Sequence, residues 1–162
     1  MTPRDAFAPL VEAHQQAVRA FLRRLCGDPA EADDLAQETF VAAWTGLDRF
    51  RGDADFRLWL YGIAYRKFLA GRRAAGRQRM REAAVADIAA TVTNPDVEAR
   101  IDLKNAMMAL SEPQRAAIAL CLAAGVSHGD AAALLELPLG TVKSHVQRGR
   151  AMLLSMLGRD HE

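Results

Sequence analysis

The sequence predicts an all-α protein made of two small helical domains joined by a flexible linker. Apolar residues recur at steps of three and four through most of the chain, and helix start and stop signals separate these periodic segments. No segment shows convincing two-residue alternation. Large apolar side chains become sparse after residue 81. We therefore place the domains at residues 1–81 and 95–162, with the linker at 82–94.

Two helices are expected at the start of the first domain. An amphipathic stripe over residues 7–25 predicts the first helix, and Gly27 provides its stop. The second helix has three agreeing start signals, with Asp28 as N-cap, Pro29 at the first helical position and Glu31 at the third. Its inward face is predicted to consist of Leu35, Thr39, Phe40, Ala43 and Trp44.

Start and stop signals also divide the second domain. Asn94-Pro95 begins a helix that ends near Leu110, and the capping box Ser111–Gln114 begins another that continues to Gly125. A weaker cap at Ser127 begins a short helix, which Leu137-Pro138 interrupts. The last helix runs from about residue 140 to 157.

The short helix, the break and the longer helix together predict a helix-turn-helix, whose second helix enters the DNA major groove. Helical spacing gives this second helix an inward stripe of Val142, Val146, Gly149 and Leu153. It leaves Lys143, Ser144, Gln147 and Arg148 on the outer face. Arginine and lysine can bind guanine edges or phosphates, and glutamine suits adenine. The alternative is a solvated face on an ordinary helical bundle.

The formal net charge of +1 conceals a strong polarity along the chain. Residues 28–38 contain acidic side chains and no basic one, whereas residues 57–81 contain eight basic side chains and no acidic one. A third helix, opening near Phe56, carries this basic stretch together with Trp59, Tyr61, Tyr65 and Phe68. Aromatic and basic side chains together suit single-stranded or melted nucleic acid. The alternative is that the aromatic residues are core and the arginines are merely solvated.

Several other functions lack a sequence signal. Cys26 and Cys121 form neither a disulfide framework nor a metal pair, and the histidines have no metal-binding spacing. Nucleophile and phosphate-loop motifs are absent, as is an apolar run of about 20 residues. We therefore expect a cytoplasmic protein without catalytic activity, metal, cofactor or membrane insertion.

Four motifs in order resemble extracytoplasmic-function sigma factors of the sigma-70 family. Residues 33–44, DDLAQETFVAAW, resemble conserved region 2, and FRGD at 50–53 with the segment 56–64 resembles the promoter −10 region that follows. LSEPQR at 110–115 and GTVKSH at 140–145 resemble region 4, which reads the −35 element. The resemblance spans nearly the whole chain and implies a region 2 bundle followed by a region 4 helix-turn-helix domain.

The resemblance also implies partners and site residues. The partners are core RNA polymerase, through its β′ clamp helices and β subunit, promoter DNA and an anti-sigma factor. The residues expected to bind core polymerase are Asp33, Asp34, Gln37 and Glu38. Those expected to bind −10 DNA are Phe50, Arg51, Trp59, Arg66, Lys67, Arg72 and Arg73. Those expected to bind −35 DNA are Thr141, Lys143, Ser144, His145, Gln147 and Arg148.

Some positions depart from the family pattern, and three alternatives stay open. Arg66 stands where the family commonly has asparagine, Ala70 near a usual acidic residue and His145 at a common arginine. The departures at Arg66 and Ala70 predict an unusual −10 base preference. The first alternative is a sigma mimic that captures an anti-sigma factor without touching DNA. The others are a response-type DNA-binding regulator and a nuclease.

Overall fold

The computed structural model describes residues 4–52, 54–81 and 95–158. Helices α1 (Phe7–Cys26) and α2 (Pro29–Thr45) pack against each other around the turn at Gly27 and Asp28. Gly27 ends α1 in a left-handed conformation with a φ of 69°. The side chain of Asp28 accepts a hydrogen bond of 2.9 Å from the backbone N–H of Ala30, which confirms it as the N-cap of α2.

The buried face of α2 differs from the predicted one at Trp44, and Phe40 is only partly buried against the core. Leu35, Thr39 and Ala43 are buried as expected, but the Trp44 side chain is 39% exposed. Its ring lies at the edge of the buried stripe, where it contacts Phe7 with a centroid separation of 5.0 Å. The prediction for Trp44 is wrong because the small residues Ala32 and Ala36 complete the inward face instead.

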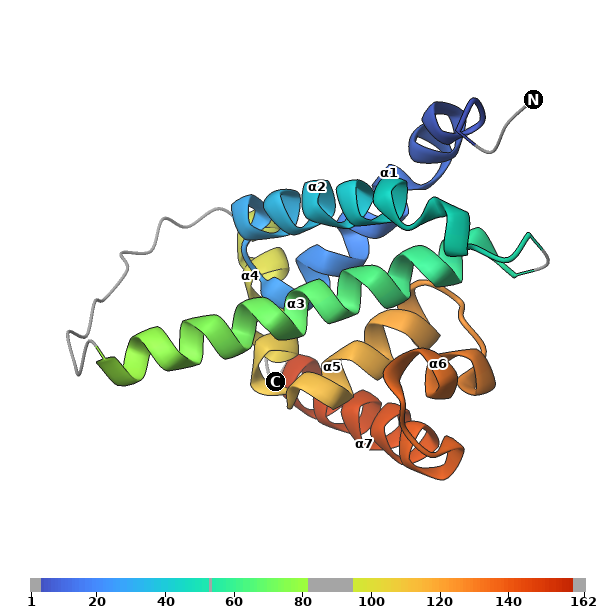
Figure 1. The fold of residues 1–162 in the computed structure, drawn as a ribbon. Helices are drawn as coiled ribbons and strands as arrows, with labels where there is room; N and C mark the ends of the chain where they lie inside the picture. Colours follow the sequence, from blue (N-terminus) through green and yellow to red (C-terminus); the bar gives the residue numbers. More distant parts are fainter. Residues whose placement is uncertain (1–3, 53, 82–94, 159–162) are drawn as a thin grey trace.

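A 3-10 turn (η1, Leu47–Arg49) leads from α2 to the long helix α3 (Phe56–Arg81). Asp55 stabilises the start of α3, since its carboxylate accepts a hydrogen bond of 2.9 Å from the backbone N–H of Arg57. In Figure 1, α2 lies along one side of α3, while α5, α6 and α7 lie on the other side, and the last turns of α3 extend beyond the body. Asp53 and Asn94, which the sequence prediction used, lie outside the described residues.

The second half contains helices α4 (Pro95–Ala109), α5 (Glu112–Ile118), α6 (His128–Leu135) and α7 (Leu139–Gly158). The predicted capping box is present, because Ser111 and Gln114 bond to each other's backbone N–H groups. Ser127 accepts a hydrogen bond of 3.1 Å from the N–H of Asp130 and so caps α6. The described residues are helical and contain no strand, which confirms the predicted fold class.

The expected single helix from Glu112 to Gly125 is not regular. Its last part, η2 (Ala119–Ala123), is a π-helix, a form common at functional sites. Within it, Leu120 is fully buried while Leu122 is 50% exposed, so the two leucines face opposite sides. The start and stop signals of the sequence predicted one continuous helix and did not indicate the wider turn.

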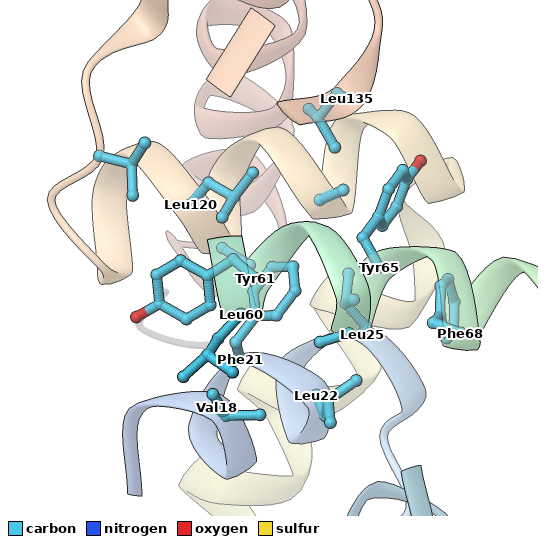
Figure 2. Close-up of a cluster of buried hydrophobic side chains, with 14 of the residues drawn as sticks. Val18, Phe21, Leu22, Leu25, Leu60, Tyr61, Tyr65, Phe68, Leu120 and Leu135 are labelled. Carbon is cyan, nitrogen blue, oxygen red and sulfur yellow. The ribbon is translucent and has the colours of Figure 1, made fainter. Parts of the chain in front are cut away.

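The two halves of the chain share one hydrophobic core. Helix α1 contacts α4, α5 and η2, and α3 contacts α6. Figure 2 shows Leu120 and Leu135 of the second half in the same cluster as Tyr61 and Tyr65 of α3. The arrangement in which the halves are packed together is called the closed arrangement below.

Candidate protein- and nucleic-acid-binding surfaces

Three of the four residues predicted to bind polymerase line one hollow beside α2. Asp34, Gln37 and Glu38 are exposed and line this hollow together with Val41, Thr45, Arg49 and Lys67. We call it the α2 hollow. Steps of three and four along a helix place these side chains on one face, which leaves two carboxylates accessible to a basic partner.

Asp33 lies on a different side of α2. Its carboxylate pairs with Arg19 at 3.9 Å and with Arg23 at 3.6 Å, both from α1. The structure therefore ties Asp33 to the α1–α2 interface, although the sequence grouped it with Asp34. The pairs are partly exposed, so each contributes little stability.

Val41 and Arg49 were missed by sequence reasoning. Val41 is 66% exposed and lies in the α2 hollow, where it offers an apolar contact among the polar side chains. Val41 follows Asp34, Gln37 and Glu38 at helical spacing, so it lies on the same face of α2. Helical periodicity could therefore have predicted that it belongs to this surface. Arg49 belongs to η1, and only the folded chain brings it beside Lys67.

Phe50 and Trp59, the two aromatic residues expected at the −10 element, form a cluster with Phe56 at the start of α3. The ring centroids of Phe50, Phe56 and Trp59 are 5.1–5.5 Å apart. Phe56 is buried, while Phe50 and Trp59 are partly exposed. The cluster is therefore both core and surface, and its outer rings can stack on unpaired bases.

A second hollow next to this cluster gathers basic side chains. Trp59, Arg66 and Lys67 line it together with Arg49 and Ala70, and we call it the α3 hollow. Arg49 and Lys67 line both hollows, so the two surfaces adjoin. Arg51 is exposed on the loop before α3. The hollow can neutralise phosphates close to an aromatic ring.

Arg72 and Arg73 differ in environment although they are neighbours on α3. Arg73 is exposed. The Arg72 guanidinium lies over the ring of Phe68, 5.0 Å from its centroid, and its Nε is 3.8 Å from a carboxylate oxygen of Glu112. Arg72 therefore contacts the second half of the chain.

Helices α6 and α7 form the predicted helix-turn-helix. Glu136 ends α6 in a left-handed conformation with a φ of 55°, and α7 begins at Leu139. Val142, Val146 and Gly149 are buried, while Lys143, Ser144, Gln147 and Arg148 are exposed, as the helical spacing predicts. Gly149 is required by close packing, since a Cβ there would lie 2.9 Å from Cγ1 of Ile118.

Thr141 and His145 are less accessible than the rest of the predicted −35 set. Both side chains are partly buried, and Nδ1 of His145 is enclosed without a hydrogen-bond partner. The exposed members of the predicted −35 set are therefore Lys143, Ser144, Gln147 and Arg148. Within the described residues, no group of three or more His, Cys, Asp and Glu side chains could hold a metal ion.

Comparison with known proteins decides the family. Residues 10–78 match the sigma-70 region 2 family, and residues 100–153 match the sigma-70 region 4 family. The chain is 33% identical to RNA polymerase sigma factor NccH of Alcaligenes xylosoxydans xylosoxydans over 94% of this chain and 87% of the relative. It is 35% identical to the ECF RNA polymerase sigma factor EcfG of Rhodopseudomonas palustris, over 94% and 86% of the two chains.

The chain belongs to the extracytoplasmic-function family of RNA polymerase sigma factors. As a sigma factor it binds core RNA polymerase and directs transcription initiation at promoters. This confirms the predicted resemblance, the region 2 and region 4 architecture and the general function. None of the helices in the described ranges is both long and apolar enough to cross a membrane.

Solved structures of sigma factors have the same fold. The sigma factor RpoE of Bartonella quintana, in complex with the anti-sigma factor NepR, is 33% identical with a TM-score of 0.81, and the match covers 94% of this sigma factor and 96% of RpoE. CnrH in complex with the cytosolic domain of CnrY is 31% identical with a TM-score of 0.73, over 97% and 90% of the two chains.

Proposed function

We propose that this sigma factor uses three binding surfaces. They lie on two domains, residues 1–81 and 95–162, which the segment 82–94 joins. The α2 hollow binds the β′ clamp helices of core polymerase. The α3 hollow with its aromatic cluster binds the −10 element, and the outer face of α7 reads the −35 element. The observation that carries the proposal is that one folded chain presents exposed carboxylates on α2, an adjoining basic and aromatic hollow, and a helix-turn-helix.

The proposed assignments follow the accessibility of each side chain. Asp34, Gln37 and Glu38 are the polymerase contacts, whereas Asp33 orients α2 against α1. Phe50, Trp59, Arg66 and Lys67 surround melted −10 DNA, and Arg51, Arg72 and Arg73 add phosphate contacts. On the −35 side, Lys143, Ser144, Gln147 and Arg148 reach DNA, while Thr141 and His145 support the helix from partly buried positions. The protein works by binding in the cytoplasm, without catalysing a reaction.

Initiation by core polymerase in a purified system tests this proposal. We expect the intact protein to direct promoter-specific initiation, which a sigma mimic or a nuclease would not do. The double substitution Asp34→Lys and Glu38→Lys should weaken core binding at least tenfold while helical content is unchanged, because both carboxylates are exposed. The control is Asp102→Lys, which reverses one exposed charge on α4 outside the α2 hollow. Equal core affinity of the double variant and the control would contradict the α2 assignment.

We further propose that an anti-sigma factor controls the protein through a groove between the halves. The groove is lined by α1, α4, η2 and α7, and it contains the exposed side chains Leu103 and Leu122. Arg23, Arg24 and Lys104 form part of its lining. Apolar side chains flanked by basic ones suit an amphipathic helix with carboxylates beside its apolar face. The RpoE and CnrH structures, each solved with an inhibitor or its domain, support this proposal.

A designed amphipathic helix can test this groove. The probe is a labelled peptide with leucines on one face and glutamates beside them. We expect Leu122→Glu to weaken peptide binding at least tenfold, while Leu154→Glu, which is 62% exposed on α7 outside the groove, has little effect. Equal binding by both variants would refute the groove as the docking site.

A further inference from the structure

Three arginines hold the two halves of the chain together in the closed arrangement. Arg115 of α5 donates a hydrogen bond of 2.9 Å from a guanidinium nitrogen to the backbone carbonyl of Leu25 in α1. Arg57 of α3 donates one of 3.3 Å to the carbonyl of Ala124, and Arg72 of α3 lies 3.8 Å from the carboxylate of Glu112. Two of the three therefore come from the basic helix that the −10 assignment uses.

The contact between Arg72 and Glu112 is the longest of these three contacts. The Nε atom of Arg72 is enclosed but forms no hydrogen bond. Its separation of 3.8 Å from the Glu112 carboxylate oxygen exceeds hydrogen-bond length. The two side chains keep 24% and 43% of their exposure. Such a pair contributes little stability, so another anion can replace Glu112 at a small cost.

The closed arrangement cannot serve both promoter elements at once. The −10 and −35 elements are about 25 base pairs apart, which corresponds to roughly 85 Å along the duplex at about 3.4 Å per base pair. A compact chain of this length has a radius of gyration of about 15 Å. The halves must therefore separate before α7 and the α3 hollow reach their elements, and the contacts between the halves must break.

We propose that the closed arrangement is autoinhibitory and that Glu112 is its latch, meaning the side chain whose contact with Arg72 favours this arrangement. While Glu112 is paired with the Arg72 guanidinium, a promoter phosphate cannot bind there. Opening of the halves frees Arg72 for DNA, and DNA binding in turn prevents reclosure. Glu112 thereby lowers the fraction of free protein that is open. The apparent affinity for DNA decreases in proportion to that fraction, because only the open form has Arg72 available. This proposal rests on the assignment of Arg72 to −10 DNA made above.

The substitution Glu112→Gln tests the latch, because it removes the charge and preserves the size of the side chain. The background is Cys121→Ser, which leaves Cys26 as the single thiol. Cys26 is buried between Leu25, which Arg115 contacts, and Gly27, which Met108 of α4 approaches. Its rate of labelling by a thiol reagent therefore reports separation of the halves. The second readout is the affinity of the free protein for a labelled single-stranded oligonucleotide.

We expect Glu112→Gln to raise both the labelling rate and the DNA affinity by about two- to fivefold, the range expected for losing one partly exposed ion pair. Asp102→Asn is the matched control, since it makes the same change in net charge on α4, beside Met156 and Leu157. It should leave both readouts unchanged. Circular dichroism must show unchanged helix content in each variant.

Three results would overturn the latch. They are unchanged readouts in Glu112→Gln, a higher DNA affinity without faster labelling, and faster labelling without a higher affinity. A failure of the proposed function is visible separately, because the unsubstituted protein would then not direct initiation by core polymerase. Glu112 is outside the proposed polymerase and promoter contacts, so we expect Glu112→Gln to initiate with core polymerase at least as well as the unsubstituted protein.

Discussion

At the residue scale, Arg115 connects more of the structure than any single motif suggested. Its side chain is 5% exposed, and it donates hydrogen bonds to the carbonyls of Met107, Met108 and Leu110 as well as Leu25. These carbonyls lie at the ends of α4 and α1, where helix dipoles place partial negative charge. Burial lowers the pKa of the Arg115 guanidinium, and the nearby Arg72 lowers it further.

Replacing Arg115 therefore affects both halves. We expect Arg115→Ala to lower the free energy of unfolding by about 3 kcal/mol or more, because buried carbonyls lose a charged donor. Arg115→Lys should lose most of the same amount, since one ammonium cannot span carbonyls that the planar guanidinium reaches. Urea unfolding of the three proteins measures both values. A lysine variant as stable as the unsubstituted protein would show that charge alone matters here.

The buried thiol of Cys26 makes stability depend on alkaline pH. Burial, aided by Glu31, raises the pKa of Cys26 from 9.0 to about 12. Because the folded-state pKa lies above the unfolded one, the thiol's contribution is fully present below pH 9 and is lost between pH 9 and about 12.

The measurement compares the unsubstituted protein with Cys26→Ala. Between pH 8 and pH 10.5, the unsubstituted protein should lose about 1–2 kcal/mol more unfolding free energy than the variant. Tyr61 and Tyr65, whose pKa values burial also raises, are common to both proteins and cancel in the comparison. Parallel losses in the two proteins would exclude Cys26 as the source.

At the scale of single elements, α7 and α3 carry basic residues that we expect to contact DNA in different ways. Arg148 is exposed on the second helix of the helix-turn-helix, where side chains reach base edges. Arg73 is exposed on α3, which has no helix-turn-helix geometry. We therefore expect base reading by the first and phosphate neutralisation by the second.

Promoter libraries randomised at −35 and −10 separate these two roles. Arg148→Ala should cost roughly 1–3 kcal/mol at promoters with a guanine in its position, and specificity at one −35 position should relax. Arg73→Ala should weaken all promoters similarly and flatten the salt dependence of binding. Uniform losses for Arg148→Ala, or a single altered base preference for Arg73→Ala, would reverse the assignment.

At the scale of the whole molecule, the two halves are separate in sequence but share a core. The segment 82–94 contains few large apolar residues, whereas Leu120 and Leu135 of the second half pack in one cluster with Tyr61 and Tyr65. Cutting the chain between the halves therefore need not separate them.

Limited trypsin digestion tests this relation. We expect the first cut near Arg81, because the predicted linker begins there. The two fragments should then co-elute in size-exclusion chromatography, held by the shared core, and should separate in mild denaturant. Early cleavage inside residues 101–122 would contradict the domain boundaries. Separate elution of the two fragments in native buffer would show that the closed arrangement needs the intact connection.

The sequence by itself determined the helices, their caps and the exposed faces of α2 and α7. These features depend on neighbours within about four positions, as Asp28, Ser111 and the 142, 146, 149 stripe illustrate. Sequence reasoning also found the two family regions, because their motifs are local. It failed at Trp44, where smaller side chains complete the buried face, and at η2, where the backbone is π-helical.

Only the tertiary structure decided which charges meet. Asp33 pairs with α1 rather than joining Asp34, and Arg49 comes beside Lys67. Arg115 reaches the carbonyl of Leu25, which is far away in the chain. The contact between Arg72 and Glu112 likewise joins residues on opposite sides of the segment 82–94. No local pattern encodes such pairs, because they depend on how the helices pack through the shared core and not on spacing along one helix.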